Sequence, residues 1–330
     1  MQAKCSRQEA SFRPPKLSAP MPDLLDLLEK TSRTFALSIP PLPEPVRREV
    51  TVAYLLFRIA DTFEDATHWP PAQRIAALGD FGFLLKNGTR AEAERLGQAW
   101  TQAGVSRHAG YRELIAETPF VFDAFAALRP EAAAILRTHV VRSADGMAGF
   151  VARTNEQGLT LHSLEDLRGY CYTVAGIVGE LLTELFLLEE SSSSLRPAAS
   201  ELRARAQAFG EALQLVNILK DSDEDAAEGR RYLPAGVPRA DVFALARRDL
   251  GEAGEYIQAL HAAGAPAGIL EFTALPVALA WAALAKVEER GPGAKVARPE
   301  VFRIARSVRG SIARGENPGL YDRTLSGEPR

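Results

Sequence analysis

Apolar residues recur at helical intervals along most of this chain. Within residues 44–66, for example, they follow one another at steps of three or four, at Val46, Val50, Ala53 and Phe57. That spacing places them on one face of an α-helix. Strict alternation of apolar and polar residues, which would indicate strands, does not occur, and no β-hairpin signal is present. The pattern therefore predicts an all-α fold.

The same periodicity sets the boundaries of the predicted elements. Helices are predicted over residues 21–30, 44–66, 131–154, 164–188, 200–225, 240–263 and 272–289, and a last one follows the loop 291–299 and ends near residue 314. Residues 72–142 read as several medium helices, with breaks at Gly79, Asn87-Gly88, Gly104 and Pro119. Loops are predicted over residues 190–197 and 226–238. We expect a disordered segment over residues 1–20, one domain over 21–314 and a flexible tail over 315–330.

Two of the predicted helices carry polar stripes with the same geometry. The first stripe is Tyr54, Arg58, Asp61 and Asp65, at relative positions 0, 4, 7 and 11. The second lies about 160 residues later and is Gln214, Asn217, Asp221 and Asp225, at 0, 3, 7 and 11. Each set falls on one helix face. Both stripes continue toward the N-terminus into apolar sequence, so we expect the acids at the rim of a buried cavity.

Either stripe alone has an equally good interpretation as a solvated helix face or a set of salt-bridge partners. Two facing pairs of carboxylates, with no His or Cys among them, favour Mg²⁺ as the ligand, and Mg²⁺ in turn favours a diphosphate substrate. A diphosphate also needs cationic side chains. The candidates are Arg33, Arg58, Lys220, Arg230 and Arg231, each of which could also be an ordinary surface charge.

Composition narrows the class of protein. The 330 residues carry a formal net charge of −3 and no basic run, which argues against nucleic-acid binding. Two distant cysteines, Cys5 and Cys171, suit neither a disulfide framework nor a zinc site and indicate a reducing compartment. No signal peptide is recognisable, and the longest uncharged apolar run, Phe272 to Ala285, contains Pro276 and is too short to span a bilayer. We therefore expect a cytoplasmic protein without a transmembrane segment.

A third feature is the sequence from Tyr170 to Gly179, which holds two tyrosines and two glycines. Glycines inside a helix indicate close approach, either by another helix or by a ligand. The segment could be a tightly packed core helix. It could also line a long apolar pocket with a tyrosine hydroxyl at the polar end.

Together these residues resemble the squalene/phytoene synthase family over roughly residues 31–305. The acid motifs match as Asp61-Thr-Phe-Glu-Asp65 and as Gln214-Leu-Val-Asn217-Ile-Leu-Lys-Asp221-Ser-Asp-Glu224-Asp225, followed by Arg230-Arg-Tyr-Leu-Pro234. Ser32-Arg33-Thr-Phe35 and Tyr170-Cys-Tyr-Thr-Val-Ala-Gly match two further motifs. Four motifs in the family's order make the resemblance specific, although each alone would be weak.

The resemblance implies a single-domain class I isoprenoid synthase bundle with a central cavity. It implies head-to-head condensation of two farnesyl diphosphates through a cyclopropylcarbinyl diphosphate, triggered by Mg²⁺. The implied metal ligands are Asp61, Glu64, Asp65, Asn217, Asp221 and Asp225. The implied substrate-binding residues are Ser32, Arg33, Phe35, Tyr54, Arg58, Gln214, Asn217, Lys220 and Arg230. Tyr170 would handle the proton or stabilise a cation, while Arg58, Asp61, Asp65, Asp221 and Asp225 would also act in catalysis. Phe35, Phe57, Val174 and Leu181 are candidates for the apolar wall.

The family contains reductive and non-reductive members. Met147-Ala-Gly-Phe150, Phe272-Thr-Ala-Leu-Pro276 and Ala294-Lys295-Val-Ala-Arg298 resemble stretches of squalene synthases, which reduce the final cation with NADPH. This implies NADPH binding by Lys295, Arg298 and Asn217. Two departures, Ala297 where an Arg is expected and Tyr170-Cys-Tyr-Thr in the tyrosine motif, keep open a synthase that stops at presqualene diphosphate, dehydrosqualene or phytoene. A non-catalytic scaffold is a remote alternative, because both acid motifs are intact. Peripheral contact with a membrane is expected from the apolar substrate and product.

Overall fold

The computed structural model describes residues 23–32, 34–156 and 158–318, and within this part of the chain the fold is all-α, as predicted. The helices are α1 (Leu24–Thr31), α2 (Phe35–Ser38), α3 (Val46–Glu64), α4 (Pro71–Asn87), α5 (Arg90–Gln102), α6 (Ala109–Ala116), α7 (Thr118–Ala126), α8 (Pro130–Ala152), α9 (Leu164–Cys171), the π-helix η1 (Tyr172–Gly176), α10 (Ile177–Leu188), the 3₁₀-helix η2 (Glu190–Ala198), α11 (Ala199–Ala227), α12 (Arg239–Ala262), α13 (Ala267–Arg290) and α14 (Arg298–Ala313). The expectations for residues 1–20 and for most of the tail fall outside the described residues.

Local sequence explains where many of these helices begin. The side chains of Asp23, Thr89 and Ser163 accept first-turn backbone N–H groups, which lack partners within the helix. Helices α4, α8 and α14 instead have a proline in their first turn, where the missing N–H costs nothing. Capping residues and prolines therefore set these N-termini.

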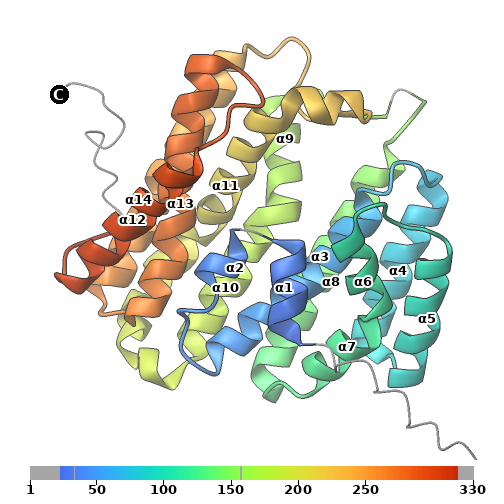
Figure 1. The fold of residues 1–330 in the computed structure, drawn as a ribbon, viewed down its shortest axis with the longest axis horizontal. Helices are drawn as coiled ribbons and strands as arrows, with labels where there is room; N and C mark the ends of the chain where they lie inside the picture. Colours follow the sequence, from blue (N-terminus) through green and yellow to red (C-terminus); the bar gives the residue numbers. More distant parts are fainter. Residues whose placement is uncertain (1–22, 33, 157, 319–330) are drawn as a thin grey trace, which may run out of the picture.

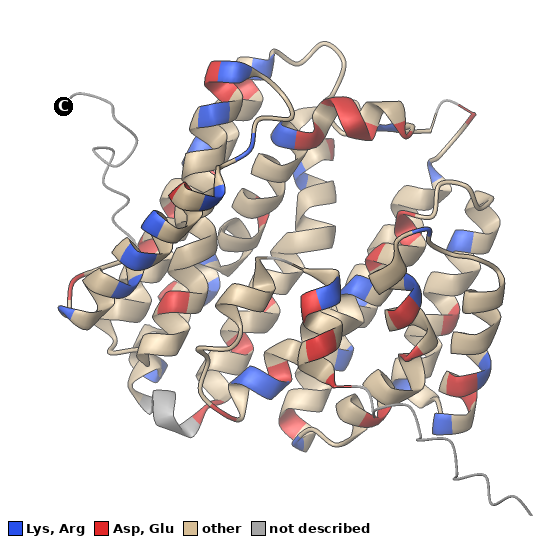
Figure 2. Ribbon diagram, in the orientation of Figure 1, with Lys and Arg blue, Asp and Glu red and all other residues tan. Residues whose placement is uncertain are grey.

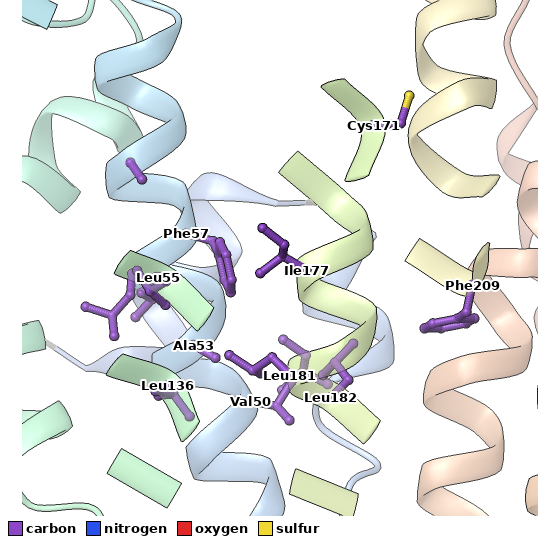
Figure 3. Packing of buried hydrophobic residues seen from close by; sticks show 14 of the residues in the cluster. Val50, Ala53, Leu55, Phe57, Leu136, Cys171, Ile177, Leu181, Leu182 and Phe209 are labelled. Atoms are coloured by element: carbon purple, nitrogen blue, oxygen red, sulfur yellow. The ribbon is translucent and has the colours of Figure 1, made fainter. Parts of the chain in front are cut away.

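The long helices α3, α10, α11 and α13 enclose the centre of the molecule (Figure 1). Helix α10 packs against α3, α8 and α11, and α11 packs in turn against α12 and α13. Figure 3 shows Ala53 and Phe57 of α3 facing Ile177 and Leu181 of α10. These side chains are buried and belong to one continuous apolar core.

The predicted helix 164–188 is interrupted by η1. The backbone N–H of Ile177 bonds to the carbonyl of Tyr172, five residues earlier, so the segment inserts one extra residue into the helical turn. Directly opposite, a Cβ added to Gly210 of α11 would lie 2.0 Å from the carbonyl oxygen of Ala175. One turn further on, a Cβ at Gly179 would lie 2.0 Å from the carbonyl oxygen of Ala206. At these glycines, therefore, it is another helix that approaches.

Two-residue strands connect segments that are distant in sequence. Strand β1 (Leu159–Thr160) pairs in parallel with β2 (Arg230–Arg231), with Leu159 opposite Arg230. Just before them, Gly158 has φ +89°, and a Cβ there would lie 1.7 Å from the carbonyl oxygen of Gly229. Only glycine allows this crossing. The pairing holds the chain after α11 beside the chain after α8.

Several predicted boundaries were wrong. Gly79 does not break a helix, because α4 is continuous through it and the position faces open space. Helix α13 begins at Ala267, whereas the predicted helix began at residue 272; Pro276 lies inside the helix in both cases. Residues 190–197, predicted as a loop, form most of η2. Tertiary packing outweighs the local preferences of single Gly and Pro residues at these places.

Two helical stretches, Leu164–Leu188 and Ala267–Arg290, are long and apolar enough to cross a membrane by length and composition. Of their most apolar windows, 56% and 67% is buried inside the protein. Buried core helices pass the same test, so this is weak evidence for a span. The absence of a transmembrane segment stays a prediction.

Candidate functional site

A cavity runs between α3, α10 and α11, with α2 and α13 at its side. Its polar lining residues are Tyr54, Arg58, Asp61, Gln214 and Asn217. These are most of the two predicted stripes, brought together from opposite halves of the chain. Of the four acids expected at the rim of a buried cavity, Asp61 lines this one, whereas Asp65, Asp221 and Asp225 are not among its lining residues.

The remainder of the lining is apolar. All four predicted wall residues, Phe35, Phe57, Val174 and Leu181, line the cavity. The ring of Phe35 lies 5.3 Å from that of Tyr54 and 6.5 Å from that of Phe272, measured between centroids. Sequence reasoning missed Ile39, Val50, Leu182 and Phe209 as further lining residues, because apolar periodicity does not distinguish a cavity wall from a core.

On α3 the first stripe forms a chain of contacts. The Tyr54 hydroxyl donates to the carbonyl of Thr31 over 3.0 Å, and Nε of Arg58 lies 3.4 Å from the Tyr54 hydroxyl. Nη1 of Arg58 lies 3.4 Å from Oδ2 of Asp61. Burial is the main reason that the pKa of Asp61 is raised to about 6; Arg58 opposes this shift and Asp65 adds to it. Asp61 is therefore a carboxylate without enough positive charge around it.

Arg230 joins the two acid motifs. Its guanidinium lies 3.5 Å from Asp65 of the first motif, 3.0 Å from Asp225 of the second and 2.7 Å from Glu228. The β1–β2 pairing holds Arg230 in this place. Figure 2 shows the acidic residues that gather on the last turns of α11. Lys220 stays on its own helix, with Nζ 3.1 Å from Asp221 and 3.3 Å from Asn217.

The oxygen ligands of the two acid motifs suit a hard cation such as Mg²⁺. Burial, followed by the charge of Asp65, raises the pKa of Glu64 to about 8, so the opposing charges of Arg74 and Arg230 do not fully compensate this carboxyl. Among the described residues no three His, Cys, Asp or Glu side chains lie close enough to hold a metal by themselves. Mg²⁺ keeps several waters and takes phosphate oxygens beside one or two carboxylates. The acids therefore fit Mg²⁺ that arrives together with a diphosphate.

Tyr170 lies in a buried polar cluster behind the first motif. Its hydroxyl donates to that of Tyr232 over 2.9 Å and lies 3.5 Å from Oε1 of Glu64. The two tyrosine rings stack, with centroids 4.5 Å apart, and Phe150 packs edge-on against Tyr170 at 5.2 Å. Burial, with Glu64 adding, holds the pKa of Tyr170 well above its usual value. The hydroxyl is thus a proton donor of fixed orientation at neutral pH.

Three further predicted residues, Ser32, Lys295 and Arg298, do not line the cavity. The Ser32 side chain accepts from the backbone N–H of Phe35, and Arg33 falls outside the described residues. Lys295 and Arg298 are exposed, and neither forms an ion pair with a described residue. Their loop is held against α11, because the N–H of Gly293 donates to the carbonyl of Lys220 over 2.7 Å.

Sequence reasoning missed Tyr232 and Tyr111 as neighbours of the site. Tyr232 stood within the quoted motif Arg230-Arg-Tyr-Leu-Pro234, so its signal was present. Tyr111 lies on α6, in a region with no recognised motif, and the centre of its ring is 5.3 Å from the guanidinium carbon of Arg58. Only the fold brings it there.

The sequence of this chain matches a known protein family and several curated proteins. The profile of the squalene/phytoene synthase family matches residues 28–305. A squalene synthase of Eremothecium gossypii is 30% identical over 218 residues, which is 66% of this chain and 46% of that protein. Squalene synthase ERG9 of Saccharomyces cerevisiae is 28% identical over 209 residues, 63% of this chain and 44% of that protein. The chain thus matches a little under half the length of these relatives.

A solved structure has the same fold. It is titled as the complex of TcSQS with the ligand E5700, and it superposes with a TM-score of 0.73. The sequence identity is 24%, and the match covers 93% of this chain and 91% of that one. At this level of sequence identity, the match shows that the two proteins share a fold.

Proposed function

Because this chain belongs to the squalene/phytoene synthase family, we propose that it joins two farnesyl diphosphates head to head, through presqualene diphosphate, to squalene. The observation that carries the proposal is the joining of two acid motifs, through Arg230, beside an apolar cavity. Such a site can bind a diphosphate at one end and an isoprenoid chain at the other. The names of the curated relatives support the same activity.

Mg²⁺ would be held by side chains of the two acid motifs, namely Asp61, Glu64, Asp65, Asn217, Asp221 and Asp225. When bound, Mg²⁺ supplies the positive charge that allows diphosphate to leave. Arg58, Lys220 and Arg230 bind and orient the diphosphate from the protein side, where their charges are worth more than in water. Ser32, Arg33 and Gln214 complete the proposed substrate contacts.

The cavity wall then protects the reacting carbons. Phe35, Phe57, Val174 and Leu181 exclude water from the allylic cation while the double bond of the second molecule attacks it. Closing the cyclopropane ring releases a proton. In the proposed step the Tyr170 oxygen accepts this proton while its own hydroxyl proton passes to Oε1 of Glu64, 3.5 Å away, so the proton ends on that carboxylate.

The reductive step is a separate part of the proposal. NADPH, when bound, supplies the hydride for the final cation. The exposed cations Lys295 and Arg298, on the loop held against α11, are suited to its phosphates, with Asn217 on the cavity side. A second candidate function, condensation without reduction, is favoured by Ala297, which stands where many squalene synthases have an Arg. Peripheral membrane contact and a cytoplasmic location also remain proposals.

Product analysis tests the two candidates. Purified protein is incubated with farnesyl diphosphate and Mg²⁺, with and without NADPH, and the extracts are analysed by gas chromatography–mass spectrometry after phosphatase treatment. We expect squalene only when NADPH is present. Dehydrosqualene or presqualene alcohol under both conditions would support the condensation and contradict the reduction. If farnesyl diphosphate gives no product, the incubation is repeated with geranylgeranyl diphosphate. The absence of a product from either substrate would contradict both candidate functions and favour a non-catalytic scaffold.

A further inference from the structure

Arg58 lies between two tyrosine rings. Its guanidinium carbon is 5.8 Å from the ring centre of Tyr54, one turn earlier on α3, and 5.3 Å from that of Tyr111 on α6. The side chain is 24% exposed and also lines the cavity. A guanidinium held over two aromatic faces keeps its N–H edge free for other partners. Here that edge contacts Tyr54 and Asp61, on the polar side of the cavity.

Helix α6 reaches this place through a close contact with α1. A Cβ added to Gly110 would lie 2.3 Å from the carbonyl oxygen of Lys30, so the two backbones touch. Nζ of Lys30 forms an ion pair with Glu113 at 2.7 Å. The next carbonyl of α1, that of Thr31, accepts the hydroxyl of Tyr54. The end of α1 therefore fixes both tyrosines relative to Arg58.

The surroundings of Tyr111 connect it to the substrate side of the site. Its ring packs against that of His108, with centroids 4.2 Å apart, and its hydroxyl donates no hydrogen bond to any described residue. Burial raises the pKa of Tyr111, Arg58 opposes the shift, and Tyr54, Asp65 and Asp61 add to it. The residue thus lies within the field of the first acid motif, although its sequence neighbourhood gave no sign of this.

We propose that Tyr111 is a positioning residue for the diphosphate, because its ring holds the Arg58 guanidinium in the orientation that binds the leaving group. This inference rests on the proposed function. It assigns a role to a residue of α6 that lies outside the recognised motifs. Tyr111 would act through Arg58 and need not touch the reacting carbons.

Binding of inorganic diphosphate with Mg²⁺, measured by isothermal titration calorimetry, tests the inference directly. Tyr111→Leu removes the ring and should weaken binding roughly 3- to 30-fold, which is the range expected for loss of one cation–π contact. Tyr111→Phe keeps the ring and should stay within about 2-fold of wild type. The KM for farnesyl diphosphate should rise with Tyr111→Leu by a similar factor.

Two further variants separate positioning from general packing. Phe125→Leu removes a ring that lies 5.5 Å from the guanidinium carbon of Arg137, on α7 and α8, and should leave diphosphate affinity unchanged. In an Arg58→Gln background, Tyr111→Leu should have an effect of less than about 2-fold, because the cation that the ring holds is gone.

Wild-type affinity in Tyr111→Leu would overturn the inference and leave the proposed function intact. A loss that is equally large in the Arg58→Gln background would also overturn it, since it would show that the ring acts only on packing. Wild-type protein that binds no diphosphate would overturn the proposed function, and the inference with it.

Discussion

At the scale of single residues, the site is defined by charges that the protein alone does not balance. Arg230 contacts three carboxylates, yet the pKa of Asp61 and that of Glu64 are still raised, to about 6 and about 8. Burial is the main cause in both cases, and neighbouring acids add to it. This arrangement lacks further positive charge, which the proposed Mg²⁺ would supply.

The metal assignment gives the first prediction. Asp61→Ala or Asp225→Ala should reduce turnover by at least about 100-fold, the scale of losing one electrostatic stabiliser, while the protein stays folded. Rates are measured with radiolabelled farnesyl diphosphate and folding by circular dichroism. Asp80→Ala, on the exposed face of α4, is the matched control. Wild-type rates in either site variant would contradict the assignment.

A second buried acid lies away from the site. Glu211 of α11 is fully buried, with Oε1 2.6 Å from Gln207 and Oε2 without a hydrogen bond among the described residues. Burial raises its pKa, Gln207 and Arg168 lower it, Asp249 raises it and Arg248 lowers it. A folded-state pKa above the unfolded value means that the fold favours the protonated form. The free energy of unfolding then falls as the pH rises from the pKa of Glu211 in the unfolded chain toward its pKa in the folded protein.

Glu211→Gln should therefore raise Tm relative to wild type, by more at pH 8 than at pH 5. The nearest cation to this buried carboxyl is Arg168, at 3.8 Å from Oε2, and replacing such a weakly compensated charge is worth on the order of 1 kcal/mol, or a few degrees for a domain of this size. The measurement is differential scanning fluorimetry at both pH values. Glu94→Gln, an exposed glutamate on α5, should change Tm by less than about one degree at either pH. A gain for Glu211→Gln that does not depend on pH would contradict the explanation.

At the scale of elements, glycines decide how closely helices approach. Gly110 of α6 touches the Lys30 carbonyl, whereas Gly79 of α4 has nothing within 4 Å of an added Cβ. Gly110→Ala should destabilise the protein by about 1–3 kcal/mol, because backbone atoms must move. Gly79→Ala should stabilise it by up to about 1 kcal/mol, because alanine favours the helix. Urea unfolding measures the stability of both variants. Equal effects of the same sign would contradict the close contact between Gly110 and the Lys30 carbonyl.

The helices also show how much of the fold could be predicted from the sequence. Apolar periodicity located the long helices α3, α8, α11 and α12 to within about three residues of their observed ends. It could not show the π-turn of η1, which depends on contact with Gly210 in another helix. The motifs identified Arg58 and Arg230, but Tyr111 reaches the site only through packing of α6 on α1. Residues placed by non-local contacts leave no local signal.

At the scale of the whole molecule, the fold joins two distant helices at one end of an apolar cavity. Arg230 lies between acids of the two motifs, and binding of Mg²⁺ with diphosphate at this place should couple to global stability. Mg²⁺ with inorganic diphosphate, at about 100 times the dissociation constant, should stabilise the fold by roughly 2.7 kcal/mol. Thermal unfolding with and without the pair measures this gain, and Asp61→Ala should lose most of it. No shift in wild-type protein would contradict the site and support a scaffold.

The contact between α10 and α11 has a consequence for the divergence of such enzymes. Gly179 and Gly210 place backbone against backbone, so these two walls of the cavity can move neither closer nor much further apart without loss of packing. A lineage that comes to accept longer or shorter chains must therefore change side-chain volume at lining positions, such as Phe57, Leu181 and Phe272, rather than the spacing of α10 and α11. We expect inherited variation in product length to concentrate at such side chains, while the two glycines stay the same.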